Sequence, residues 1–166
     1  PKVIDNKREF GHWEGDLMSF IKNSQHILVL RERLSMFTLS AVLPNKKAQS
    51  SAQKLIKLMA DIPGLARKSL TLDNVGEFTD HHQWLETLKL PSYFCDAYAS
   101  WQKGGVENTN GRLRRDMPRR TNVHQLSKED FDENILNYNT TPRKALGWKT
   151  PLEIFNRNLG RVALQT

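Results

Sequence analysis

Ser69-Leu70-Thr71-Leu72-Asp73-Asn74 is the stretch of this chain that decides its fold. The first four residues alternate as a short buried strand does, and the strand ends at an acidic residue followed by turn-forming Asn74. A carboxylate at the end of a core strand is costly unless a cation, a hydrogen-bond network or water receives it. We therefore expect Asp73 to face a partner from another part of the chain.

Three strands joined by short turns are predicted ahead of this stretch. Turn residues follow the first and third of them, and apolar residues then recur at helical spacing from Lys46 to Ala60. The three predicted strands span 12–20, 27–30 and 37–43. Because they follow one another directly, they predict an antiparallel sheet on which the helix packs.

Behind Asp73 the chain alternates again between helix and strand. A helix over 77–88, a strand over 91–95, a turn-rich loop and a helix over 106–115 give the order βββαβαβα. Two later helices open at Ser127 and at the clearer capping box of Thr150, Pro151 and Glu153. We expect the last helix to end near Asn156, with an uninformative tail beyond it.

Composition favours a nucleic-acid partner. The 166 residues include 25 Lys and Arg against 18 Asp and Glu, a formal charge of +7, and their 38% hydrophobic content is enough for one core. A soluble protein with a solvated basic face is the alternative on charge alone.

The chain also carries signs of its compartment. A lone Cys95 excludes an internal disulfide and a cysteine-based zinc site, and no apolar run approaches the roughly 20 residues of a membrane helix. We expect a soluble cytoplasmic protein. The start at Pro1, without an initiator Met, indicates a domain cut from something longer, with 1–10 a linker remnant, 11–160 the folded domain and 161–166 a tail.

The first strand brings further acidic residues. Because residues i and i+2 of a strand face the same way, His12, Glu14 and Asp16 share one side. Asp16 lies nearest the strand centre and approaches Asp73 if the two strands are neighbours. The alternative is an Asp16 at an exposed edge of the sheet.

A third carboxylate, Glu107, lies in the helix that follows Gly104-Gly105. At helical spacing Lys103, Asn110, Gly111 and Arg114 lie on its side. Residues 101–120 hold six basic side chains against two acidic ones, so the alternative for Glu107 is a local ion pair. We expect these side chains to position DNA, with Tyr98 and Trp101 either stacking on a base or packing under the loop.

Taken together, the motifs resemble those of the DDE transposases and retroviral integrases, and among them the bacterial insertion-sequence-thirty transposases. The resemblance covers nearly the whole chain and includes a gap of 33 residues between the second and third acids. The motifs are 11–16, Thr71-Leu72-Asp73-Asn74 through Glu77-Phe78, 93–96, Gly104 with 107–111, and Pro142-Arg143 through Trp148 to Thr150-Pro151 with Glu153 and Phe155.

The resemblance implies an RNase H-like fold with a five-stranded mixed sheet flanked by helices. It implies that Asp16, Asp73 and Glu107 are the catalytic acids and that they hold a pair of Mg²⁺ ions, or Mn²⁺ in their place. The implied activity is cleavage and strand transfer of DNA at insertion-sequence ends in a homo-oligomeric complex, in the bacterial cytoplasm with the nucleoid. The expected DNA contacts are Lys103, Asn110, Arg112, Arg114, Arg115, Arg119 and Arg120.

Two departures from the family pattern and two rival functions stay open. Val75 stands where the family usually has Gly, and Gly105-Val106 replace a polar pair. Both departures leave the three acids in place, and they affect the shape of the turn after Asp73. The resemblance also implies an N-terminal helix-turn-helix region. A non-enzymatic DNA-binding module and an RNase H-like nuclease without strand transfer are the alternatives.

Overall fold

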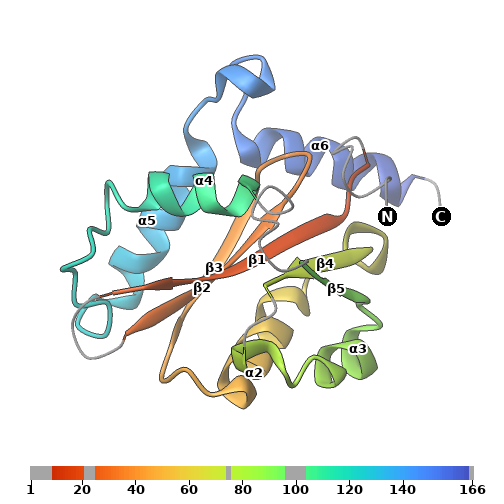
Figure 1. Cartoon of the computed structure of the whole chain (residues 1–166). Coiled ribbons are helices and arrows are strands. Elements are labelled where there is room, and N and C mark those ends of the chain that lie inside the picture. Colours follow the sequence, from red (N-terminus) through yellow and green to blue (C-terminus); the bar gives the residue numbers. More distant parts are fainter. Residues whose placement is uncertain (1–8, 21–24, 74–75, 96–103, 165–166) are drawn as a thin grey trace.

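A mixed five-stranded sheet lies at the centre of the computed structural model, which describes residues 9–20, 25–73, 76–95 and 104–164 (Figure 1). The strand order is β3-β2-β1-β4-β5, so β1 is the central strand. The strands are β1 (His12–Ser19), β2 (His26–Glu32), β3 (Thr38–Leu43), β4 (Ser69–Leu72) and β5 (Ser92–Phe94). The α/β class and the five-stranded mixed sheet expected from the sequence are confirmed.

The sheet combines two kinds of strand pairing. β1 pairs with β2 and β2 with β3 in antiparallel fashion, as the consecutive short turns predicted. β4 and β5 join in parallel, each after a helical crossover, through α2 (Ala48–Met59) and α3 (His82–Leu88). The strand that carries Asp16 therefore lies beside the strand that leads to Asp73.

Helices cover both faces of the sheet and enclose two hydrophobic cores. Trp13, Leu70 and Leu72 pack with α2 and α3 on one face, whereas Met18 and Val29 pack with α4 (Gly104–Leu113) and α5 (Lys128–Thr140) on the other (Figure 1). The alternation along β1 therefore sends its acidic residues toward α4.

Gly15 allows the first core to close over the central strand. A Cβ atom at this position would lie 2.6 Å from Leu72 Cδ2 and 3.2 Å from Leu30 Cδ2. Leucine side chains from both neighbouring strands occupy the space that a side chain would need. A small residue is thus required directly before Asp16.

The predicted helix over 77–88 is wrong in its first half. A 3-10 helix, η3 (Gly76–Phe78), comes first, and the α-helix begins only at His82. Phe78 is buried and anchors the short turn in the core, while the Thr79 hydroxyl donates to the Gly76 carbonyl. Leu85, expected on the apolar face, is 45% exposed, whereas Trp84 and Leu88 of the same helix are buried.

The last helix, α6 (Pro151–Ala163), is about two turns longer than predicted. Its start is as expected, since Thr150 and Glu153 form a complete capping box. Phe155 stacks on Phe37 with ring centroids 4.3 Å apart. Leu159 and Val162 continue the same apolar face beyond Asn156 and pack against the core. This packing explains why the helix extends past Asn156.

Helix α5 protects the outer edge of the sheet. The Asn139 amide donates to the Thr38 carbonyl at 2.8 Å and accepts from the Thr38 main-chain N–H at 2.9 Å. This side chain thus replaces a neighbouring strand at the end of β3. Across the described ranges, no helix combines the length and the apolar character needed to cross a membrane.

Candidate active site

The register of β1 and β4 brings Asp16 level with Asp73. His12, Trp13 and Glu14 pair with Ser69, Leu70 and Thr71, and two residues beyond the last pair come Asp16 and Asp73. Neighbouring strands lie about 4.8 Å apart, and partners in parallel strands point to the same face. Both aspartates are half-buried, and Asp16 lies on the central strand rather than on an edge.

Helix α4 meets the same carboxylate from above. The Asn110 amide donates to Asp16 Oδ2 at 2.8 Å. Glu107 lies one turn earlier on α4 and is exposed. Because residues three apart on a helix are neighbours, Glu107 belongs to the side of α4 that reaches Asp16. The strand register and this hydrogen bond bring Asp16, Asp73 and the side of α4 that carries Glu107 to one face of the sheet, next to the middle of β1.

A buried ionic cluster fixes where α4 begins. Glu14 is fully buried, and its Oε2 accepts the main-chain N–H of Val106 at 2.6 Å. Its other oxygen accepts from Arg33 Nε at 2.7 Å, and Arg31 Nη1 lies 3.7 Å from Oε2. A carboxylate at a helix N-terminus accepts a hydrogen bond from a free N–H and interacts favourably with the helix dipole. Glu14 therefore ties α4 to β1.

Gly105 makes this contact possible. A Cβ atom here would lie 2.3 Å from Arg31 Nη1 and 2.5 Å from Glu14 Oε2. The helix consequently begins at Gly104 instead of Val106, where the sequence predicted its start. The departure Gly105-Val106 thus belongs to α4, whereas Val75 lies outside the described residues.

A cationic cleft of about 510 Å³ lies next to Asp16. Arg114 donates to the Ser19 carbonyl, and its guanidinium carbon lies 4.6 Å from the centre of the Phe20 ring. Burial, and secondarily the charge of Arg119, lowers the pKa of Arg114. The cleft is lined by Leu17, Met18, Ser19, Phe20, Asn110, Gly111, Arg114 and Arg119. Asn110, Gly111 and Arg114 therefore share one side of α4, as their spacing indicated.

The remaining expected DNA contacts differ in their surroundings. Arg112, Arg115, Arg119 and Arg120 are exposed, and Arg112 donates to Asn108 Oδ1 at 3.1 Å. Lys103, Tyr98 and Trp101 lie outside the described residues. Contact of these side chains with DNA stays a prediction.

The acids do not form a closed metal cluster. Within ranges 9–20, 25–73, 76–95 and 104–164, no group of three His, Cys, Asp or Glu side chains lies close enough to hold a metal ion. Asn110 Oδ1 is buried and has no hydrogen-bond partner in this part of the chain. Asn110 Oδ1 is therefore available to bind a further partner beside Asp16.

Transposases of insertion sequences match this chain over almost its whole length. InsI of IS30A from Escherichia coli (strain K12) is 40% identical over 156 residues, which cover 94% of this chain and 40% of that protein. The chain is similar to IS30-family transposases. The transposases of IS1086 from Cupriavidus metallidurans and IS4351 from Bacteroides fragilis are 33% and 30% identical, over 93% and 95% of this chain.

This chain spans less than half the length of these relatives, between 40% and 48%. No model of a known protein family matches it. Among solved structures, the catalytic core domain of BIV integrase superposes with a TM-score of 0.73 at 20% identity, over 92% of this chain and 98% of that one. The integrase-core fold implied by the sequence motifs is confirmed.

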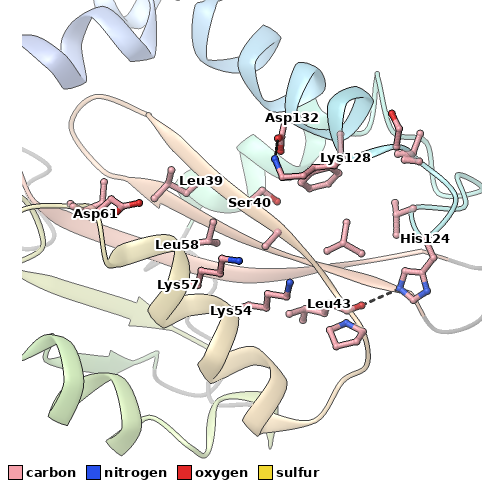
Figure 2. A pocket seen from close by; sticks show the side chains of 18 residues that line it. Leu39, Ser40, Leu43, Lys54, Lys57, Leu58, Asp61, His124, Lys128 and Asp132 are labelled. Atoms are coloured by element: carbon pink, nitrogen blue, oxygen red, sulfur yellow. Dashed lines mark hydrogen bonds and ion pairs between the residues drawn. The ribbon is translucent and has the colours of Figure 1, made fainter.

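A larger groove lies on another part of the sheet. It has a volume of about 880 Å³ and runs between β3, α2 and the start of α5. Figure 2 shows Lys54 and Lys57 of α2 facing it, with the Lys128–Asp132 pair and His124 on the opposite wall. None of the three acids lines this groove. Asp16 instead lies beside the smaller cationic cleft, through its hydrogen bond with Asn110.

Sequence reasoning missed the counter-charges of Glu14. It placed Glu14 on an acidic face of β1, whereas Arg31 of β2 and Arg33, directly after β2, neutralise the Glu14 carboxylate. Arg31 is the cross-strand partner of Glu14. The signal was present as two arginines at i and i+2 on the next strand, but using it requires the register of the hairpin.

Proposed function

We propose that this chain is the catalytic core of an IS30-type transposase that cleaves DNA at insertion-sequence ends and joins the 3′ ends to target DNA. The carrying observation is that the pairing of β1 with β4 and the Asn110–Asp16 hydrogen bond bring Asp16, Asp73 and the Glu107 side of α4 to one face of the sheet. The names of the relatives, each a transposase of an insertion sequence, support the same reaction.

The donor atoms at this place fit Mg²⁺ or Mn²⁺. The three acids and Asn110 offer oxygen only, which hard divalent cations prefer, and Asn110 Oδ1 is buried beside Asp16 with no hydrogen-bond partner in the described ranges. Asp16, Asp73 and Glu107 are the proposed ligands of a pair of ions. Exposure leaves Glu107 free to change rotamer toward Asp16. Such ions, when bound, activate an oxygen nucleophile and stabilise the leaving oxygen.

The side chains around the acids have separate tasks in this proposal. Asn110 holds Asp16 in one rotamer through its 2.8 Å hydrogen bond. Arg114, fixed by the Ser19 carbonyl and the Phe20 ring, presents positive charge to the scissile strand. Water is the nucleophile for end cleavage, and the freed DNA 3′-hydroxyl is the nucleophile for strand transfer. Because two ends must be joined, we propose that the active complex contains more than one copy.

The test is a Mg²⁺-dependent assay of nicking and strand transfer with a labelled duplex that ends in a free 3′-hydroxyl. Asp16→Asn, Asp73→Asn and Glu107→Gln are each expected to lower both rates by at least about 100-fold, because each removes a charged ligand. Glu86→Gln, a matched change of an exposed acid on α3, is expected to leave both rates unchanged.

The rival functions give different results in the same assay. Wild-type rates in Asp73→Asn would contradict the assignment of the acids. Hydrolysis without joining of the 3′-hydroxyl would indicate an RNase H-like nuclease. Tight DNA binding without any Mg²⁺-dependent nicking would indicate a non-enzymatic DNA-binding module.

A further inference from the structure

The connection between α5 and α6 forms an ordered hairpin that we call the Trp148 loop (143–149). Its ends pair through an isolated bridge, in which Arg143 N donates to the Lys149 carbonyl at 2.9 Å and Trp148 N donates to the Arg143 carbonyl at 2.9 Å. Figure 1 shows this connection projecting beyond α5 and α6. The loop is thus held in one shape by its own main chain.

Trp148 is placed unusually within this loop. Its side chain is 70% exposed, whereas Trp13 and Trp84 are completely buried. Its φ angle of 65° lies in the left-handed region, as does that of Gly147 at 64°. A bulky residue is strained in this conformation, and exposure forfeits the burial that an indole normally gains. The described fold uses neither feature, which points to a ligand outside the chain.

The surroundings of Trp148 are positively charged. The loop contains Arg143, Lys144 and Lys149 and no acidic residue. The Arg143 guanidinium lies 4.5 Å from the centre of the Tyr138 ring and donates to the Tyr138 carbonyl at 2.9 Å. An exposed aromatic side chain among cations is a combination that nucleic acids recognise through base stacking and phosphate contacts.

The loop adjoins the proposed DNA surface of α4. Arg143 contacts Tyr138, and the Tyr138 hydroxyl lies 2.9 Å from the Thr109 hydroxyl of α4. Burial chiefly lowers the pKa of Arg143, and the charges of Arg112 and Arg115 lower it further, which agrees with this placement. Arg112 lies in the last turn of the helix that carries Glu107. A strand that lies along α4 therefore has the Trp148 loop within reach.

We propose that the Trp148 loop is a DNA-binding site in which the indole stacks on an unpaired base and Arg143, Lys144 and Lys149 contact phosphates. The proposal rests on the proposed function for the identity of its ligand. An unpaired base is required because bases within a duplex already stack on both faces. Such bases occur at a cleaved or frayed DNA end, which is the place where the acids act.

The test measures DNA affinity by fluorescence anisotropy, in EDTA, for a duplex with a single-stranded overhang and for the blunt duplex. Trp148→Ala is expected to weaken binding of the overhang duplex by between about 5-fold and 150-fold, with a smaller loss for the blunt duplex. Trp148→Phe retains most of the affinity because it keeps an aromatic face. Leu85→Ala, a matched truncation of an exposed side chain on α3, has no effect.

Iodide quenching supplies a measurement that needs no change at Trp148. In a Trp101→Phe background, the exposed indole of Trp148 is expected to be quenched in the free protein and protected by the overhang duplex, while buried Trp13 and Trp84 contribute little. Equal quenching with and without saturating DNA would overturn the proposal.

Two further outcomes decide against the proposal. One is unchanged affinity of a folded Trp148→Ala variant, and the other is a loss of self-association in sedimentation without a loss of DNA affinity, which would indicate a protein partner.

Binding by Asp73→Asn separates this proposal from the proposed function. If that variant binds in a Trp148-dependent manner while wild type never nicks DNA, only the proposed function fails.

Discussion

Glu14 shows how single residues position the acids. Its fully buried carboxylate contacts Arg31 of β2, Arg33 in the turn after β2, and the Val106 N–H of α4. Burying such charges costs several kcal/mol per ion, which good geometry only just offsets. The cluster is therefore better understood as a device that sets the position of α4, and with it Glu107 and Asn110, than as a source of stability.

Glu14→Gln tests this device. The change keeps the shape but removes the charge that Arg31 and Arg33 face, so the free energy of unfolding is expected to fall by about 3–5 kcal/mol. Urea unfolding followed by circular dichroism measures it, with Glu86→Gln as the exposed control. A loss below about 1 kcal/mol would mean that Glu14 does not hold α4.

The two glycines of α4 are expected to respond in opposite directions to alanine. Gly105→Ala places a Cβ atom against Arg31 and Glu14 and is expected to cost about 1–3 kcal/mol of unfolding free energy. Gly111→Ala meets nothing within 4 Å and is expected to stabilise by about 0.5–1 kcal/mol through helix propensity. Thermal and urea unfolding of both variants check the signs, and destabilisation by Gly111→Ala would refute the comparison.

At the scale of elements, two helices are fixed at their N-termini in different ways. α6 begins with a local capping box, Thr150 with Glu153, in which every partner lies within three residues. α4 begins with Glu14, 92 residues away from Val106 along the chain. The first start was predictable to the residue and the second was not, because a distant cap leaves no periodic signal beside the helix.

The capping box of α6 predicts a pH dependence. The main-chain N–H of Thr150 donates to Glu153 and holds its pKa below the ordinary value of 4.5. A lowered pKa means that the stabilisation is present above about pH 4.5 and is lost as the pH falls through the folded-state pKa. Glu153→Gln is therefore expected to flatten the acid limb of the stability profile, measured by urea unfolding between about pH 3 and 7.

Thr150→Ala provides the companion measurement for this helix. Loss of the N-cap hydroxyl is expected to cost about 1 kcal/mol of unfolding free energy, whereas Thr150→Ser keeps most of it. Equal losses in the two variants would show that the hydroxyl is not what caps α6.

At the scale of the whole molecule, charge and surface agree on a polyanionic partner. The net charge is +7, and the exposed arginines that follow Glu107 lie at the end of α4 beside the cationic cleft. The groove between β3, α2 and α5 is lined by none of the three acids, so the proposed chemistry takes place on the face that carries α4. This arrangement suits DNA, whose binding depends on many phosphate contacts.

Salt dependence tests this surface. Arg115→Ala is expected to weaken DNA binding and to reduce the slope of log affinity against log salt concentration by about 0.9, since one phosphate contact is lost. Lys54→Ala, a matched loss of one cation on α2, is expected to change the slope less. Anisotropy titrations between about 50 and 200 mM NaCl measure both, and identical slopes for the two variants would exclude Arg115 as a contact.

The sequence by itself determined the order of strands and helices and the caps at Ser127 and Thr150, and it predicts which three acids are catalytic. These features depend on spacing within a few residues, or on motifs that stand whole in the sequence. Asp73 illustrates this, because the end of a buried strand and an adjacent turn already mark it.

Only the tertiary structure decided which strands are neighbours, where α4 begins and what Asp16 touches. The Asn110–Asp16 hydrogen bond joins residues 94 positions apart, and the parallel pairing of β1 with β4 is equally remote. Such contacts are selected by the packing free energy of the whole chain, which local periodicity does not contain. For the same reason, the exposure of Trp148 became visible only once every other tryptophan of the described chain was seen to be buried.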